Sequence, residues 1–243
     1  MYEIDYTPEW RKKRMAKRLN MEPFAFFRDD DVGYQNSAFR ELAHYFLRCT
    51  IPLNVAVIPS EISLLDSETR DILSRPELFL MQHGHNHKTV YTANNGDHSE
   101  FHINVPKDQN RKKLSKGKRL FTESFNPRVL SFVPPRHGFP QIDLLIEEGY
   151  DLISGYGDGI EMIVGSILSS PVNLDIIADY EKGELHPNKV LIDHLKMVLE
   201  RDGFVGVLLH HNFMPRDYKV SLDEILNALS KQGIPIKRMD HIK

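Results

Sequence analysis

Leu78-Phe-Leu-Met-Gln-His83-Gly-His-Asn-His87 joins a short, mostly apolar run to three histidines within five residues. A run of this length predicts a buried β-strand. Gly84 gives the chain a way out of the strand, because glycine adopts backbone conformations that other residues avoid. His83 and His87 stand four residues apart, and one helical turn would bring both imidazoles to one side, where they could share a metal ion. A polar loop that merely contains histidines is the alternative. Two imidazoles do not complete a metal site, so further ligands must come from elsewhere in the chain.

Alternating strand and helix patterns on both sides of this stretch predict the fold class. Short apolar runs predict strands at residues 24–27, 53–58, 78–82, 129–133, 151–154 and 204–209, and residues 161–180 have the pattern of irregular β structure. Helical patterns occur between them, at residues 35–48, 62–73, 107–125, 142–148 and 186–201. Such alternation predicts an α/β fold with a mostly parallel sheet and helices outside it. We expect one domain over residues 21–243, preceded by a basic leader helix at residues 1–20.

Composition excludes several classes of protein. The 243 residues are 41% hydrophobic and 27% charged, which is typical of a soluble globular domain. A formal net charge of -3 provides no general basic field for nucleic acid. Cys49 is the only cysteine, so neither an intrachain disulfide nor a cysteine-built zinc site can form. The sequence has no signal-peptide pattern and no apolar run long enough to span a membrane, so we expect a cytoplasmic protein. The sequence does not indicate an oligomeric state.

Polar clusters follow four of the predicted strands. They are Asp29–Asp31, His83–His87, Pro135-Arg136-His137 and His210-His211. In α/β folds, ligands bind at the carboxyl ends of parallel strands, so these clusters are expected to meet at one edge of the sheet. Any one of them could be a solvated turn. Together they supply the histidine and aspartate ligands that suit a divalent transition metal with positions left open for water.

In this order, the motifs resemble those of the NodB-like polysaccharide deacetylases of carbohydrate esterase family 4. The matching pieces are Asp30-Asp31 (or Asp29-Asp30), His83-Gly-His-Asn-His87, Phe132-Val-Pro-Pro-Arg-His-Gly138 and Leu208-Leu-His210, within residues 24 to 212. The resemblance implies a distorted (β/α) barrel and a metal-dependent hydrolase that removes an N-acetyl, or other amide-linked acyl, group from a sugar, polysaccharide or glycan precursor. Two features depart from the family pattern: Arg136 follows the prolines instead of preceding them, and the family's later tryptophan has no counterpart, since Trp10 is the only one.

The resemblance also implies roles for individual residues. Asp30 would be the general base, Asp31 would bind the metal together with His83 and His87, and His210 would be the general acid. The assignment within the aspartate run can shift by one position, because any two adjacent residues of the three fit the motif. His85 would stay outside the metal set.

The remaining candidates surround this set. Arg136 or Asp158 would orient the base or the acid, and His211 competes with His210 for the acid role. Residues expected to contact the substrate are Pro135, His137, Asp158 and His211. Zn²⁺ is the expected ion, although the same ligands accept Co²⁺, Ni²⁺ or Mn²⁺.

Two other functions remain open at this stage. The same chemistry would hydrolyse a small non-sugar amide or ureide, because it needs only a carbonyl carbon and a departing nitrogen. A non-catalytic barrel that binds metal or glycan is the second alternative, and the displaced Arg136 supports it.

Overall fold

The computed structural model of the chain describes residues 22–33, 36–92, 98–157, 161–163 and 167–242, and it is built around one curled sheet. The leader helix expected at residues 1–20 lies outside the described residues. The sheet has nine strands in the order β10-β13-β1-β2-β3-β6-β7-β9-β8. Every neighbouring pair is parallel except β8 and β9, which are antiparallel.

The elements have the following bounds. The strands of the sheet are β1 (Phe24–Val32), β2 (Leu53–Val57), β3 (Leu78–His83), β6 (Ser131–Val133), β7 (Leu152–Ile153), β8 (Glu161–Ile163), β9 (Ile167–Ser169), β10 (Leu174–Asp175) and β13 (Phe204–Leu209). The helices are α2 (Asn36–Arg48), α3 (Ser67–Leu73), α4 (Lys107–Phe125), α5 (Ile142–Glu147), α6 (Asn188–Asp202) and α7 (Tyr218–Lys231). Two small hairpins, β4 (Tyr91–Thr92) with β5 (His98–Ser99) and β11 (Ile177–Asp179) with β12 (Glu184–Leu185), lie outside the main sheet.

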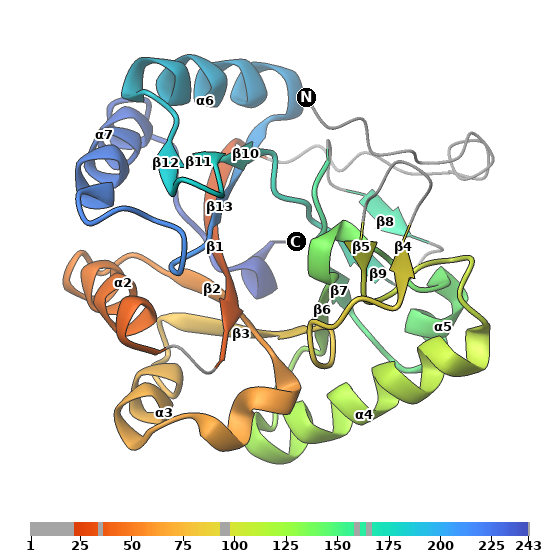
Figure 1. Cartoon of the computed structure of the whole chain (residues 1–243). Helices are drawn as coiled ribbons and strands as arrows, with labels where there is room; N and C mark the ends of the chain where they lie inside the picture. Colours follow the sequence, from red (N-terminus) through yellow and green to blue (C-terminus); the bar gives the residue numbers. More distant parts are fainter. Residues whose placement is uncertain (1–21, 34–35, 93–97, 158–160, 164–166, 243) are drawn as a thin grey trace.

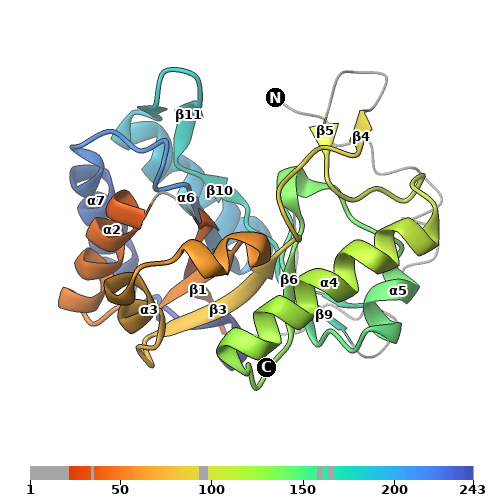
Figure 2. The same cartoon turned by 60° about the horizontal axis from the view of Figure 1, so that its bottom comes forward.

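The helices surround the curled sheet on its outside, so the predicted distorted (β/α) barrel is confirmed (Figures 1 and 2). Apolar runs form its central strands because those strands are covered on both faces; all residues of β2 and β13 are buried. Inside the curl, Phe26 stacks on Phe204 with ring centroids 6.3 Å apart. Each fully buried phenylalanine stabilises the fold by about 1.5–3 kcal/mol.

Two local predictions need correction. The helix expected over residues 62–73 is a 3-10 helix, Pro59–Leu64, followed by α3. A separate helix, α3, begins at Ser67 because the side chain of Asp66 accepts a hydrogen bond from the backbone N–H of Thr69 (2.7 Å) and caps the helix. The segment between His83 and His87 is a bend, not a helical turn. Within the part of the chain that is described, no helix is long and apolar enough to cross a membrane.

Strand register brings the predicted polar clusters to one edge. Asp29 pairs with Leu209 across β1 and β13, so the residues that follow in both strands lie at the same end. His83 pairs with Val133 across β3 and β6. The carboxyl ends of these four strands therefore carry the candidate functional side chains.

Candidate active site

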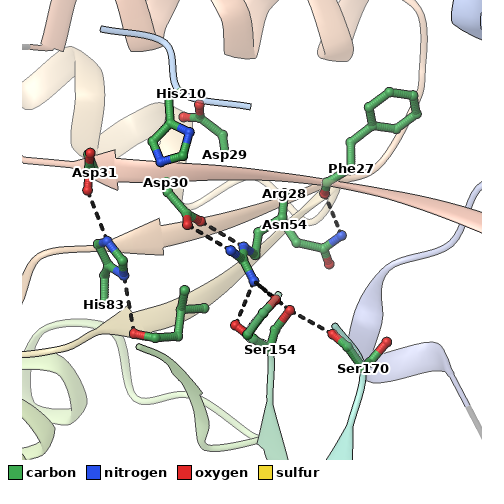
Figure 3. A network of polar contacts seen from close by, with 12 residues as sticks. Phe27, Arg28, Asp29, Asp30, Asp31, Asn54, His83, Ser154, Ser170 and His210 are labelled. Atoms are coloured by element: carbon green, nitrogen blue, oxygen red, sulfur yellow. Dashed lines mark hydrogen bonds and ion pairs between the residues drawn. The ribbon is translucent and has the colours of Figure 1, made fainter. Parts of the chain in front are cut away.

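Each of the three consecutive aspartates in β1 has a partner of its own. Asp29 contacts His211, Asp30 contacts Arg28, and Asp31 contacts the two histidines of the β3 loop. The repulsion expected among adjacent carboxylates is thus relieved by separate cationic or hydrogen-bonding groups. Figure 3 shows the run with His210 beside it.

Asp31 is the aspartate that faces the two histidines proposed as ligands. Its Oδ1 lies 2.9 Å from Nε2 of His83 and 3.1 Å from Nε2 of His87. The three potential ligand atoms lie within 4.8 Å of one another. Of the two aspartate registers that the sequence leaves open, this geometry corresponds to the one with Asp31 as the ligand.

The chemistry of this trio fits a metal ion. Nδ1 of His83 lies 3.2 Å from the backbone carbonyl of Val133, which can only accept, so Nδ1 carries the proton. The lone pair on Nε2 of a neutral His83 then points at the carboxylate of Asp31. Two electron-rich atoms at this distance require a cation between them, either a proton or a metal ion. A backbone carbonyl that fixes the tautomer is a common feature of histidines that bind metals.

The surroundings keep Asp31 ionised. Burial raises the pKa of Asp31. The hydrogen bonds to His83 and His87 and the charge of His83 lower the pKa by more than burial raises it, so the net pKa lies well below its ordinary value. For His83, burial lowers the pKa, and the contacts with Asp31 and the charge of Asp30 raise it above its ordinary value. An ionised carboxylate and two imidazoles form a suitable donor set for a divalent transition metal.

Asp30 is held by a buried arginine from its own strand. Arg28 donates from Nε to Oδ1 and from Nη2 to Oδ2 of Asp30, both at 2.8 Å. Its Nη1 donates to the backbone oxygen and the hydroxyl of Ser154 at 2.6 and 2.7 Å, and to the carbonyl of Gly155 at 3.2 Å. Arg28 is fully buried, and Figure 3 shows its guanidinium between Asp30 and Ser154. Such a bidentate pair fixes both the position and the orientation of the carboxylate.

Arg28 also sets the protonation state of Asp30. Burial alone would raise the pKa of this carboxyl, but the charge of Arg28 and that of His83 lower it more, and the net pKa is below its ordinary value. Asp30 is therefore an ionised acceptor at neutral pH.

Arg136, which the sequence proposed for this orienting role, lies elsewhere. Arg136 is exposed, in the short 3-10 helix Pro135–His137. Among the described residues, the side chain that donates hydrogen bonds to Asp30 is Arg28. The sequence analysis did not identify Arg28 as the partner of Asp30. A useful signal was present, because an arginine inside a buried apolar strand needs a carboxylate beside it.

His210 and His211 occupy different environments. His211 is buried, with Nδ1 2.8 Å from Oδ2 of Asp29 and its backbone N–H 3.0 Å from Oδ1. Burial lowers the pKa of His211, but the charge and hydrogen bond of Asp29 outweigh it and raise the pKa. The side chain of His211 is enclosed by the protein and links β13 to β1 through Asp29. A contact between His211 and substrate stays a prediction.

His210 is partly exposed and is held by a tyrosine that the sequence did not indicate. The hydroxyl of Tyr180 lies 2.7 Å from Oδ2 of Asp175 and 2.9 Å from Nδ1 of His210. Burial and the charge of Asp175 raise the pKa of Tyr180, so the phenol stays protonated. Because the hydroxyl has one hydrogen, which it donates to the carboxylate, Nδ1 of His210 donates to the tyrosine oxygen. Among the described residues, this arrangement leaves Nε2 of His210 without a hydrogen-bond partner.

The other candidate residues are placed as follows. Pro135 is buried against the loop that follows β3 and contains the candidate metal ligands (residues 83–87, called the metal loop below). A Cβ added to Gly84 of this loop would lie 2.3 Å from the ring of Pro135. Asp158 lies outside the described residues, and so does the side chain of His137. His85 is buried and does not belong to the Asp31, His83 and His87 group.

Solved structures share this fold across most of the chain. A putative polysaccharide deacetylase from Mycobacterium smegmatis is 16% identical, with a TM-score of 0.65 and 93% of each chain covered. PdaA of Bacillus subtilis, a family 4 carbohydrate esterase, is also 16% identical, with a TM-score of 0.60, covering 92% of this chain and 81% of that one. The fold is therefore the distorted barrel of the family 4 carbohydrate esterases, in a divergent sequence.

One structural relative is described as a pseudoenzyme. BA3943 of Bacillus anthracis, a pseudoenzyme of the same family, is 12% identical, with a TM-score of 0.63, and the match covers 91% of this chain and 65% of that one. No family model and no curated protein matches the sequence. At these identities the likeness shows the fold alone, and the function has to be argued from the site.

Proposed function

We propose that this protein is a metal-dependent hydrolase that removes an N-acetyl group from a sugar, polysaccharide or glycan precursor. The observation that carries the proposal is the combination, at one edge of the sheet, of the Asp31, His83 and His87 trio with Asp30 and His210. The polysaccharide deacetylase and the carbohydrate esterase that share the fold support the choice of a carbohydrate substrate.

Asp31, His83 and His87 would hold one divalent ion, most simply Zn²⁺. When bound, such an ion supplies Lewis acidity that activates water and polarises the acyl carbonyl. Asp30, kept ionised and oriented by Arg28, accepts the proton of the attacking water. His210, in its doubly protonated form and with Nδ1 hydrogen-bonded to Tyr180, donates the Nε2 proton to the departing amine and is left neutral.

The proposal is tested by adding Zn²⁺ to the purified protein and offering N-acetylated sugars, their oligomers and ureides, with detection of acetate, formate and ammonia. Acetate release that needs metal, and that falls by on the order of 10²-fold or more in Asp30→Asn and His210→Ala, is expected. Full metal-dependent activity in both variants would show that these roles are misassigned. Release of ammonia or formate instead of acetate would indicate that the substrate is a small non-sugar amide or ureide.

A non-catalytic barrel is the second candidate, because BA3943 has this fold and is described as a pseudoenzyme. Metal bound by this protein without turnover of any compound in the panel would favour it. The buried Arg28–Asp30 pair argues for catalysis, because it holds an ionised acceptor beside the metal trio.

The hydroxyl of Tyr180 provides a narrower test. Tyr180→Phe is expected to lower kcat by on the order of 10- to 100-fold with little change in KM, since Nδ1 of His210 loses its partner and the tautomer is no longer fixed. Steady-state kinetics on the best substrate of the panel measures this. Tyr45→Phe is the matched control, because it removes a tyrosine–aspartate hydrogen bond, to Asp223, that involves no histidine. An equal loss of kcat in both variants would contradict the role of Tyr180.

A further inference from the structure

Glu100 is a buried carboxylate that contacts the backbone of the metal loop and has no part in the chemistry described above. The residue is 1% exposed. Its Oε2 accepts the backbone N–H groups of His85 and His87, both at 3.1 Å, and its Oε1 accepts that of Asn86 at 3.0 Å. Three consecutive amides of the loop therefore converge on one side chain.

This convergence depends on an unusual loop backbone. Gly84 has φ 58° and His87 has φ 55°, so the segment begins and ends in the left-handed region. Successive N–H groups in such a turn point to the same side and form a concave site for an anion. Here the anion is supplied by the chain itself, from a segment 13 to 15 residues further along.

Glu100 and Pro135 also pack closely against Gly84 of the loop. A Cβ added to Gly84 would lie 2.4 Å from Oε2 of Glu100 and 2.3 Å from the ring of Pro135. Glu100 is thus enclosed by the loop that it binds. Lys113, whose Nζ lies 3.4 Å from Oε1, is the charged side chain that contacts it from α4.

Glu100 does not belong to the trio of potential ligands. Its effect on the site passes through the backbone of His87, a ligand candidate held in a conformation that β-carbon-bearing residues rarely adopt. Removal of the carboxylate would leave three buried N–H groups without an acceptor, and the loop would have to rearrange to satisfy them.

We propose that Glu100 is a positioning residue that preorganises His87 for metal binding and thereby sets the metal affinity of the site. This inference rests on the proposed metal site and deepens it. The amides, not the ion pair with Lys113, transmit the effect, because all three bonds end on the backbone of the metal loop.

The test measures Zn²⁺ affinity of the full chain by competition with a chelating dye. Glu100→Gln keeps the shape of the side chain but replaces one acceptor oxygen with a donor, and it should weaken Zn²⁺ binding by about 10- to 100-fold. Lys113→Met is the matched control, since it removes the ion pair and leaves the three amide bonds; its affinity should change less than about threefold. Glu100→Asp, which keeps the charge but is one methylene shorter, should lie between them and serves if Glu100→Gln does not fold.

Hydrogen exchange provides a readout independent of metal. Amides of residues 85–87 should exchange faster in Glu100→Gln than in the wild type in the absence of added Zn²⁺. Unchanged Zn²⁺ affinity in Glu100→Gln and Glu100→Asp would overturn the inference. Zn²⁺ binding by the wild type with no acetate release would contradict the proposed function and leave this inference standing, whereas a wild type that binds no Zn²⁺ would contradict both.

Discussion

His83→Ala is expected to weaken Zn²⁺ binding by on the order of 10²- to 10³-fold, and with it any metal-dependent hydrolysis. The reason is the small number of ligands: the site offers one carboxylate and two imidazoles, and catalytic zinc sites use three protein ligands. His83 is also the ligand whose tautomer is fixed by the carbonyl of Val133, which directs the lone pair of its Nε2 toward the ion. Elemental analysis after dialysis, together with titration against a chelating dye, measures the loss.

His85→Gln is the control for this prediction. His85 lies two residues away on the same loop and is buried, but it is not one of the three grouped ligands. Its replacement should leave Zn²⁺ affinity within a few-fold of the wild type. Equal losses in the two variants would mean that the loop as a whole, and not the imidazole of His83, determines binding.

Arg28→Met is expected to have the second large effect, on both stability and activity. Arg28 and Asp30 have side chains that are 0% and 4% exposed, and removal of one partner of a buried ion pair leaves an uncompensated charge. Such a change typically destabilises a protein by about 3–5 kcal/mol. Activity should fall as well, because Asp30 loses its orientation and its pKa rises. Chemical denaturation and steady-state kinetics measure the two effects, and Arg28→Lys, which keeps a charge, is available if Arg28→Met does not fold.

The pH dependence of this loss has a definite sign. The pKa of Asp30 in the wild type is lowered, so the stability that it contributes is present at neutral pH and disappears as the pH falls through that pKa. In Arg28→Met, protonation removes the buried unpaired charge. The stability difference between the two proteins should therefore be largest at neutral pH and shrink on acidification.

Arg136→Met is the matched control, because the sequence motif favours Arg136 and the structure places it on the surface. Its stability should change by less than about 0.5 kcal/mol. A loss of kcat in Arg136→Met as large as that in Arg28→Met would contradict the structural assignment of the orienting arginine.

The comparison of these two arginines shows what the sequence could and could not predict. Strand and helix periodicity were enough to predict the parallel sheet, the full length of α4 (Lys107–Phe125) and the edge of the sheet at which the histidines meet. The partner of Asp30 depends on which side chains face each other across strand ends, and sequence order contains no such information. Motif order favoured Arg136, whereas side-chain alternation along β1 places Arg28 and Asp30 on one face.

The acid side of the site shows the same limit. His210 was identified because it follows an apolar strand, but Tyr180 precedes it by 30 residues, in a segment of short irregular strands with no clear period. The spacing of His83 and His87 was informative for a reason different from the predicted one. The two imidazoles come together because Gly84 and His87 have positive φ angles and the chain forms a bend between the histidines. A four-residue spacing alone cannot distinguish such a bend from a helical turn.

The irregularity at the end of β1 explains how three identical residues acquire three different partners. Pairing with β2 shifts register between Asp29 and Val32, and Asp31 has φ 68°. In a regular strand, Asp29 and Asp31 would share a face. The bulge turns Asp31 toward the β3 loop while Asp29 stays against β13. Position relative to the bulge, and not residue type, therefore distinguishes the three aspartates. An insertion or deletion of one residue in this run is therefore expected to reassign the partners of all three aspartates at once.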